Sequence, residues 1–338
     1  MLRIVDGDGR FAEPPILVAT DLRKSYGDRP ALKGLTLSLR PGRILGFLGP
    51  NGAGKTTAIR ILTTMMEPDG GSFTVDGIGS EDAEEIRRRI GVLPESLGFH
   101  KHMTGLESLT FFGRLYGLSA KAARAKSLEL LAEVGLDKRA TSTVGSYSRG
   151  MRQRLGIART LVNDPAVVFL DEPTLGLDPR GQQELLELIR NVAGTRKVAI
   201  VLCSHALPEV ESVCDDVIIL NLGQVVASGP VGEVIGRTQR DVMQRNSIRI
   251  QVASEFTAQA QRALSAVAGV AQAAPTGETA GWLRVDLTAG DIAPTERLRI
   301  NNRLLDALIR NDITVLNFET EGGRLQEVFL HLTEEAIR

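Results

Sequence analysis

The sequence predicts an α/β fold followed by a smaller α+β domain, and three patterns along the chain carry this prediction. Residues 49–57 read GPNGAGKTT, between an apolar strand pattern and an apolar-periodic helix pattern. From residue 167 onward, short apolar runs typical of buried parallel strands alternate with helical patterns. Beyond residue 246 the order becomes strand, helix, strand, strand, helix, strand.

The segment GPNGAGKTT fits the pattern G-x-x-x-x-G-K-[ST] of a phosphate-binding loop. Its glycines let successive backbone N–H groups turn toward one anion. We expect Lys55 to reach the β- and γ-phosphates of a nucleotide, and the Thr56 hydroxyl to ligate Mg²⁺. The helix that follows adds about half a positive charge at its N-terminus. The expected nucleotide-binding residues of this loop are Gly49, Pro50, Asn51, Gly52, Ala53, Gly54, Lys55, Thr56 and Thr57.

A second candidate site is the acidic end of an apolar strand. Residues 167–172 read VVFLDE, so two adjacent carboxylates follow four apolar residues. Such a pair is costly at a strand end unless a cation or hydrogen-bond donors face it. We expect Asp171 to hold Mg²⁺, and Glu172 to take a proton from an attacking water molecule.

The composition is that of an ordinary globular chain. It has 338 residues, 43% hydrophobic and 24% charged, with a formal net charge of −1. This length is enough for about two domains. A near-neutral charge gives no electrostatic reason to expect a nucleic-acid partner. The two cysteines, Cys203 and Cys214, are too few for a disulfide framework, so reduced thiols are expected.

Pattern changes along the chain predict four segments. We expect a leader over residues 1–15, a nucleotide-binding domain over 16–238, a linker over 239–246 and a C-terminal domain over 247–338. A helical block over about 96–164 interrupts the α/β pattern. The leader has no apolar signal core, and no apolar run approaches the roughly 20 residues that span a bilayer. These absences lead us to expect a cytosolic chain.

The C-terminal domain resembles the ferredoxin-like plan. Strand patterns at SIRIQV, WLRVDL and ITVLNFE alternate with helical patterns in the β-α-β-β-α-β order, provided that a strand lies near residues 268–274. That strand is weakly patterned. A last helical pattern, LQEVFLHLTEEAI, ends the domain.

Further motifs follow the phosphate loop in a specific order. Residues 147–154 read YSRGMRQR, residues 171–179 read DEPTLGLDP, and a Ser-His pair follows the next strand pattern at 204–205. With the phosphate loop and the helical block, this order resembles the ATP-binding subunit of ABC transporters over about residues 16–236. The resemblance implies a P-loop NTPase core with an antiparallel β subdomain and a helical subdomain. It also implies ATP and Mg²⁺ as cofactors.

The resemblance further implies a head-to-tail homodimer with each ATP between the two chains. Ser148 and Gly150 of one chain would grip the γ-phosphate bound by the other, at the N-terminus of a helix. Tyr26 would stack on adenine, and Asp178 would lie at the dimer interface near the opposite site. His205 would contact the γ-phosphate and hold the attacking water.

Two positions depart from the family pattern. The family signature is usually Leu-Ser-Gly-Gly-Gln, but its third and fifth positions here are Arg149 and Met151. Where the family usually has a glutamine that touches Mg²⁺, the segment GVLPE places Glu95. A carboxylate can ligate Mg²⁺ but adds negative charge near phosphates, so a contact of Glu95 with the metal is left open.

The segments GVLPE, YSRGMRQR and LQEVFLHLT together resemble ATPases of exporters whose membrane permease is a separate protein. That resemblance implies export of a drug, an ion or a lipid-like substrate, at the cytoplasmic face of the cell membrane. The permease would dock on residues 99–117, which are rich in aromatic and apolar side chains. The C-terminal domain would stabilise the dimer or regulate turnover. Alternatives are an importer ATPase, a non-transport ATPase acting on ribosomes or DNA, and a small-molecule sensor in the C-terminal domain.

Overall fold

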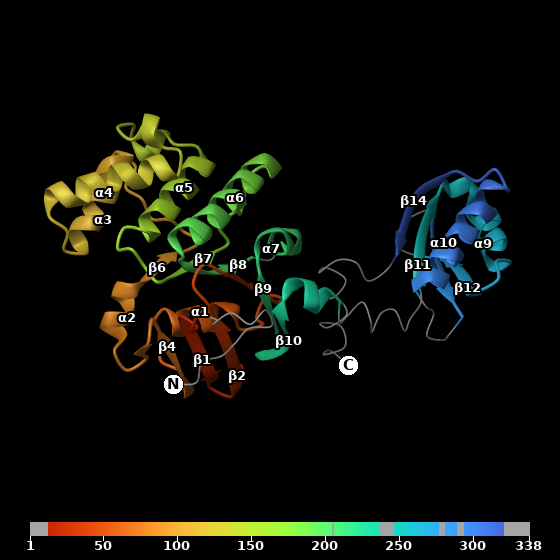
Figure 1. Cartoon of the computed structure of the whole chain (residues 1–338), viewed down its shortest axis with the longest axis horizontal. Coiled ribbons are helices and arrows are strands. Elements are labelled where there is room, and N and C mark those ends of the chain that lie inside the picture. Colours follow the sequence, from red (N-terminus) through yellow and green to blue (C-terminus); the bar gives the residue numbers. More distant parts are fainter. Residues whose placement is uncertain (1–12, 205, 237–246, 277–280, 289–293, 321–338) are drawn as a thin grey trace. The chain divides into compact units, whose positions relative to one another are not determined.

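The computed structural model describes residues 13–204, 206–236, 247–276, 281–288 and 294–320 (Figure 1). The chain divides into two compact units, with the boundary between Val231 and Gly232. Each unit is described by itself. The expected linker at 239–246 and nearly all of the expected leader lie outside the described residues, as does the helix expected after residue 320.

The centre of the first unit is a six-stranded sheet in the order β10-β9-β3-β8-β7-β6. Five of these strands run parallel, and β10 is antiparallel to β9. The sequences of β3 and β8 are continuously apolar, which predicts strands buried on both faces. Every residue of both strands is buried. The strands are β3 (Ile44–Leu48), β6 (Ile90–Leu93), β7 (Val167–Asp171), β8 (Ala199–Cys203), β9 (Asp216–Asn221) and β10 (Gln224–Pro230).

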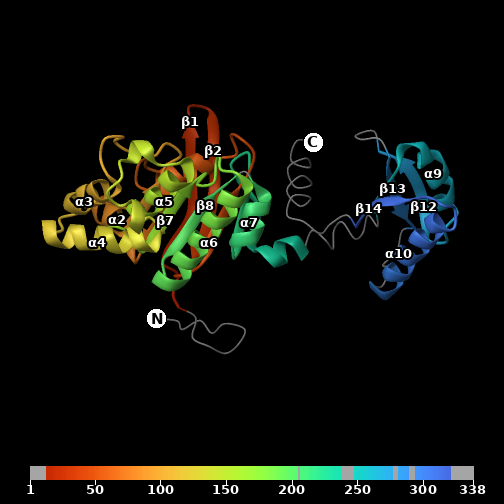
Figure 2. The ribbon, with the colours of Figure 1, turned by 90° about the horizontal axis from the view of Figure 1, so that it is seen from above.

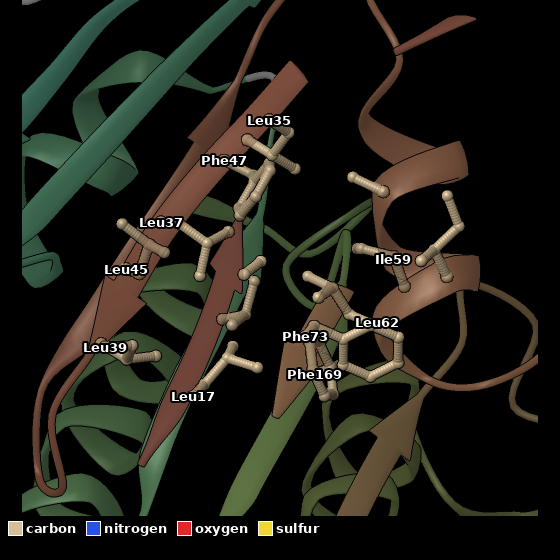
Figure 3. Packing of buried hydrophobic residues seen from close by; sticks show 14 of the residues in the cluster. Leu17, Leu35, Leu37, Leu39, Leu45, Phe47, Ile59, Leu62, Phe73 and Phe169 are labelled. Atoms are coloured by element: carbon tan, nitrogen blue, oxygen red, sulfur yellow. The ribbon is translucent and has the colours of Figure 1, made fainter. Parts of the chain in front are cut away.

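A smaller antiparallel sheet has the order β2-β1-β4-β5. One hydrophobic cluster joins it to the central sheet and to helix α1 (Lys55–Leu62). Figure 3 shows Leu35 and Leu37 of the small sheet near Phe47 of the central sheet, and Phe73 and Phe169 near Leu62 of α1. This cluster fixes the helix that follows the phosphate loop. The strands are β1 (Leu17–Tyr26), β2 (Arg29–Leu39), β4 (Gly70–Val75) and β5 (Ile78–Gly79).

Helices fill the segment between β6 and β7, as predicted. A reciprocal capping box between Thr104 and Glu107 starts α3, and the Ser148 hydroxyl caps α5. The elements of this segment are α3 (Gly105–Leu115), α4 (Ala120–Glu133), α5 (Arg149–Thr160) and two short 3₁₀ turns, η1 (Asp137–Arg139) and η2 (Val144–Ser146). Helix α2 (Ala83–Arg89) precedes β6.

Two further helices, α6 (Pro179–Arg196) and α7 (Leu207–Val213), follow β7 and β8. Successive strand residues point to opposite faces. Phe47 belongs to the cluster around α1, whereas the next residue back, Gly46, faces Val210 of α7. Helix α7 therefore packs on the face of the sheet opposite α1, and Figure 2 shows α6 and α7 on the side away from β1 and β2.

The second unit contains β11 (Ser247–Val252), α9 (Thr257–Ser265), β12 (Val270–Pro275), β13 (Trp282–Leu287), α10 (Pro294–Ile309) and β14 (Val315–Thr320). The strand expected near residues 268–274 is present as β12. The four strands named here for the second unit form an antiparallel sheet in the order β12-β13-β11-β14. Apolar side chains of the sheet and both helices, such as Ile250, Leu264 and Leu304, form a separate core.

Candidate nucleotide-binding site

The site is built where parallel strands of the central sheet end. Cys203 of β8 pairs with Phe47 of β3 on one side and with Asp171 of β7 on the other. The carboxyl ends of these strands therefore meet at one edge of the sheet, where open α/β sheets bind ligands. The phosphate loop follows β3, Ser204 follows β8, and Glu95 comes two residues after β6 at this same edge.

The backbone of the phosphate loop needs glycine. Gly49, Gly52 and Gly54 have φ values of 154°, 83° and 108°, in the left-handed region. At Gly54 an added Cβ would lie 2.4 Å from the carbonyl oxygen of Ala31, so no larger residue fits. Helix α1 begins at Lys55, directly after this turn, and its first N–H groups face the loop. This backbone geometry is compatible with the anion cradle that the sequence predicts.

Some side chains of the phosphate loop are accessible to a ligand, and others belong to the protein core. The Lys55 ammonium group donates hydrogen bonds to the carbonyl oxygens of Gly49 and Pro50, so it lies over the loop. Thr56 is exposed, so its hydroxyl is accessible to a ligand. Ala53 and Thr57 are buried, so their side chains stabilise the loop and only their backbone can face a phosphate.

The N–H groups of the loop and helix, the Lys55 ammonium group and the Thr56 hydroxyl together suit a nucleoside triphosphate with Mg²⁺. Helix N–H groups and an ammonium group suit phosphate oxygens, and one hydroxyl suits an ion that the phosphates also hold. Within the described residues there is no group of three or more His, Cys, Asp or Glu side chains that could hold a metal by itself. Mg²⁺ usually binds through few protein ligands and substrate phosphates.

Carboxylates crowd the end of β7. Burial raises the pKa of the Asp171 carboxyl, and the nearby negative charges of Glu172 and Glu95 raise the pKa further. The positive charges of Lys55 and Arg60 act in the opposite direction. Asp171 therefore lies close enough to Lys55 of the phosphate loop and to Glu95 for their charges to affect its pKa.

Glu172 has an unusual backbone conformation for a glutamate, with φ of 48°. Its N–H donates to the carbonyl oxygen of Cys203 at 2.9 Å, which ties the turn after β7 to the end of β8. Left-handed backbone at a residue other than glycine costs about 1–3 kcal/mol and is concentrated at functional sites. The conformation turns the chain sharply directly after Asp171.

Three of the expected residues gather elsewhere on the first unit. Ser148 accepts a hydrogen bond from the N–H of Met151 at 3.2 Å, as an N-cap does. Ser148, Gly150 and Asp178 line one hollow of about 390 Å³, and none of its described lining residues belongs to the phosphate loop. Asp178 precedes α6, and its side chain makes no capping hydrogen bond.

Tyr26 and His205 are two further residues that the sequence predicts for the site. Tyr26 ends β1, is 49% exposed, and its hydroxyl donates to the Met66 sulfur at 3.3 Å. Its ring is therefore available to a ligand. His205 lies outside the described residues, and the preceding Ser204 is fully buried.

The sequence pattern does not distinguish Arg159 of α5, because an arginine in an amphipathic helix usually faces solvent. Its guanidinium donates to the carbonyl oxygen of Leu97 at 2.7 Å. It also lies over the rings of Phe99 and Phe112, 4.8 and 5.3 Å from their centroids. Burial lowers its pKa. Arg159 thus joins α5, α3 and the loop that follows Glu95.

Known proteins resemble this chain along nearly its whole length. Residues 32–175 match the family described as ABC transporter. The daunorubicin resistance ATP-binding protein DrrA3 of Streptomyces coeruleorubidus is 37% identical over 93% of this chain and 95% of its own length. The linearmycin resistance ATP-binding protein LnrL of Bacillus subtilis (strain 168) is 30% identical over 96% of this chain and 100% of its own.

Solved structures resemble about two thirds of this chain. A structure of an ATP-binding subunit of an ABC transporter has a TM-score of 0.58 at 31% identity, covering 66% of this chain and 93% of its own. CbiO1 of Clostridium perfringens, part of the ABC transporter complex CbiONQ, has a TM-score of 0.63 at 26% identity, covering 69% and 96%. Among the described residues, no helix is long and apolar enough to cross a membrane. With its phosphate loop and acidic strand end at one sheet edge, this chain belongs to the ABC transporter family as an ATP-binding protein.

Proposed function

We propose that the chain hydrolyses ATP as a homodimer and thereby powers export through a separate membrane permease. The observation that best supports ATP hydrolysis is that the phosphate loop, Asp171 and Glu172 lie at one edge of the central sheet. Export is supported by relatives whose names give resistance to daunorubicin and linearmycin. Their similarity extends over the second unit as well.

The residues of the site have distinct roles in this proposal. The glycine turns and the N-terminus of α1 hold the phosphates, and Lys55 neutralises part of their charge. Thr56 and Asp171 would hold Mg²⁺, which would supply positive charge to the phosphates. Glu172 accepts the proton of the attacking water, and His205 orients that water. Catalysis here is mainly positioning and charge stabilisation.

The homodimer would complete each site. Ser148 and Gly150 stand at the start of α5, a helix of 12 residues whose N-terminal N–H groups favour an anion. They line a hollow with Asp178 and without any phosphate loop residue among those described. This separation supports their action on the nucleotide held by the second copy of the chain.

The permease would dock on the helical segment. Phe111 and Leu115 of α3 and the next residue, Tyr116, are 49%, 66% and 46% exposed, which is unusual for large apolar side chains. The same helical segment has a hollow of about 510 Å³, lined by residues 95–99, Lys101, Val144, Gly145 and part of α5. Its lining includes Glu95, whose charge acts on Asp171, so a partner seated there can sense the nucleotide site.

The second unit would serve as an accessory domain of the ferredoxin-like type. Its order of elements and its sheet order β12-β13-β11-β14 support that plan. Because it has its own core, it can act on the dimer as a separate body. We propose that it stabilises the dimer or regulates turnover.

The test combines hydrolysis with partner identification. The full chain is tagged and recovered from detergent-solubilised native membranes, and its ATP turnover is compared with that of Glu172→Gln. We expect a polytopic membrane protein to co-purify without a soluble binding protein, and the variant to lose about 10²–10⁴-fold in turnover. Near-normal turnover in the variant would overturn the role of Glu172. A binding protein or a ribosome as the partner would replace export with the corresponding alternative.

A further inference from the structure

The side chain of Glu209 is a buried carboxylate that the proposed mechanism does not use. Glu209 of α7 is only 8% exposed. Its Oε2 atom accepts hydrogen bonds from the hydroxyl of Thr174 at 2.7 Å and from the hydroxyl of Ser204 at 3.0 Å. A buried carboxylate is costly unless donors surround it, so these two bonds are what allow Glu209 to be there.

The two donors belong to the two loops that carry the proposed catalytic side chains. Thr174 comes two residues after Glu172, in the turn after β7. Ser204 follows β8 directly and precedes His205 in the sequence. The Ser204 hydroxyl also accepts from the N–H of Ala206 at 3.0 Å, so its orientation is fixed from both sides.

Helix α7 holds this carboxylate rigidly against the sheet. An added Cβ at Gly46 of β3 would lie 2.4 Å from Val210 and 3.1 Å from the Cys214 sulfur, so helix and strand approach as closely as glycine permits. Val210 and Val213 are buried on the same helix. The position of Glu209 is therefore set by the strand that leads into the phosphate loop.

We propose that Glu209 is a positioning residue, which fixes the turn of Glu172 relative to the end of β8 through Thr174 and Ser204. The inference rests on the proposed ATPase. β7 and β8 pair as far as Asp171 and Cys203, and the backbone bond from Glu172 to Cys203 extends this connection by one residue. The Glu209 bridge extends it further, to Thr174 and Ser204, and so holds the turn on both sides of Glu172. Proton transfer from water needs Glu172 within hydrogen-bond reach, so its rate depends on this orientation.

The test uses the full chain and separates turnover from nucleotide binding. Glu209→Ala removes the acceptor, whereas Glu209→Gln keeps an oxygen that both hydroxyls can reach. We expect Glu209→Ala to lower kcat by about 10–100-fold with KM for ATP nearly unchanged, because small misplacements of catalytic groups cost this much. We expect Glu209→Gln to retain most of the wild-type kcat. Glu211→Gln, an exposed charge change on the same helix, is the matched control with unchanged turnover.

Thr174→Val keeps the shape of the side chain and removes its donor, so it tests the bridge if Glu209→Ala does not fold. We expect it to lower kcat without raising KM, and to add little further loss in the Glu209→Ala background. Unchanged kcat in Thr174→Val, or equal losses in Glu209→Gln and Glu209→Ala, would overturn the proposal. Should the wild-type chain and Glu172→Gln hydrolyse ATP equally, the proposed ATPase mechanism fails instead, and the two failures are distinct.

Discussion

The guanidinium of Arg149 lies against the backbone of Gly176. A Cβ built at Gly176 would be 2.6 Å from the central carbon of the guanidinium and 2.7 and 2.9 Å from its two terminal nitrogens. Gly176 has φ of 70°, in the left-handed region. Arg149 stands where the family signature usually has glycine. This departure therefore has a structural partner, because the arginine occupies space that a second glycine leaves open.

Gly176→Ala tests this packing. We expect the alanine to destabilise the chain by about 1–2 kcal/mol through left-handed strain, and further by displacing the guanidinium. In an Arg149→Ala background only the strain remains, so the same change costs less by about 0.5–1 kcal/mol. Chemical denaturation of the four chains of this cycle measures the coupling. Additive losses would mean that Arg149 moves aside freely.

Asp171→Asn tests the negative charge of Asp171 at the end of β7. The folded chain binds the Asp171 proton more tightly than the unfolded chain, because burial and the charges of Glu172 and Glu95 raise its pKa. The stability contribution of Asp171 therefore falls as pH rises from the ordinary value of about 3.9 through the raised pKa, and stays low above it. We expect Asp171→Asn to abolish Mg²⁺-dependent turnover but raise Tm of the nucleotide-free chain at pH 7 by about 1–3 °C.

The pH dependence provides the control for that variant. Its advantage in stability over the wild-type chain is largest above the raised pKa and disappears when pH falls below the ordinary carboxyl range. Thermal unfolding at several pH values measures it. A constant difference at all pH values would point to altered packing, and a loss of stability at pH 7 would contradict the raised pKa.

Much of this fold follows from local patterns in the sequence. Strands such as β3 and β8 are apolar at every position, and the glycines, Lys55 and Thr56 of the phosphate loop are adjacent in sequence. The acidic end of β7 was likewise visible, because Asp171 and Glu172 directly follow an apolar run. Where a site lies within one segment, its chemistry can be predicted from that segment.

Contacts between distant segments could not be predicted in the same way. Glu209 and Thr174 are 35 positions apart, and nothing in the segment LPEVESV distinguishes a buried glutamate from a solvated one. Arg159 and Leu97 are 62 positions apart. Such pairs depend on how helices pack on the sheet, which the sequence pattern specifies only as an apolar face.

Arg159→Leu tests the link between the nucleotide site and the docking surface. The arginine holds the loop after Glu95 through Leu97 and packs on Phe99 and Phe112. We expect the leucine to fill the apolar space but free the loop, so that ATP turnover of the isolated chain persists while stimulation by the co-purified permease is lost. Turnover of the variant is measured with and without the permease in proteoliposomes. Normal stimulation would show that the loop is held by other contacts.

Truncation after Gln239 tests the role of the second unit. The first unit keeps its whole central sheet and its own core, and the apolar core of the second unit is separate. We therefore expect the truncated chain to fold and to bind ATP as the full chain does. If the second unit stabilises the dimer, the ATP-bound dimer of Glu172→Gln dissociates more readily when truncated, which sedimentation at several concentrations measures. Equal dimerisation and equal turnover in the two lengths would leave the second unit without a role in the ATPase cycle. A changed turnover at equal dimerisation would instead indicate regulation within the assembled dimer.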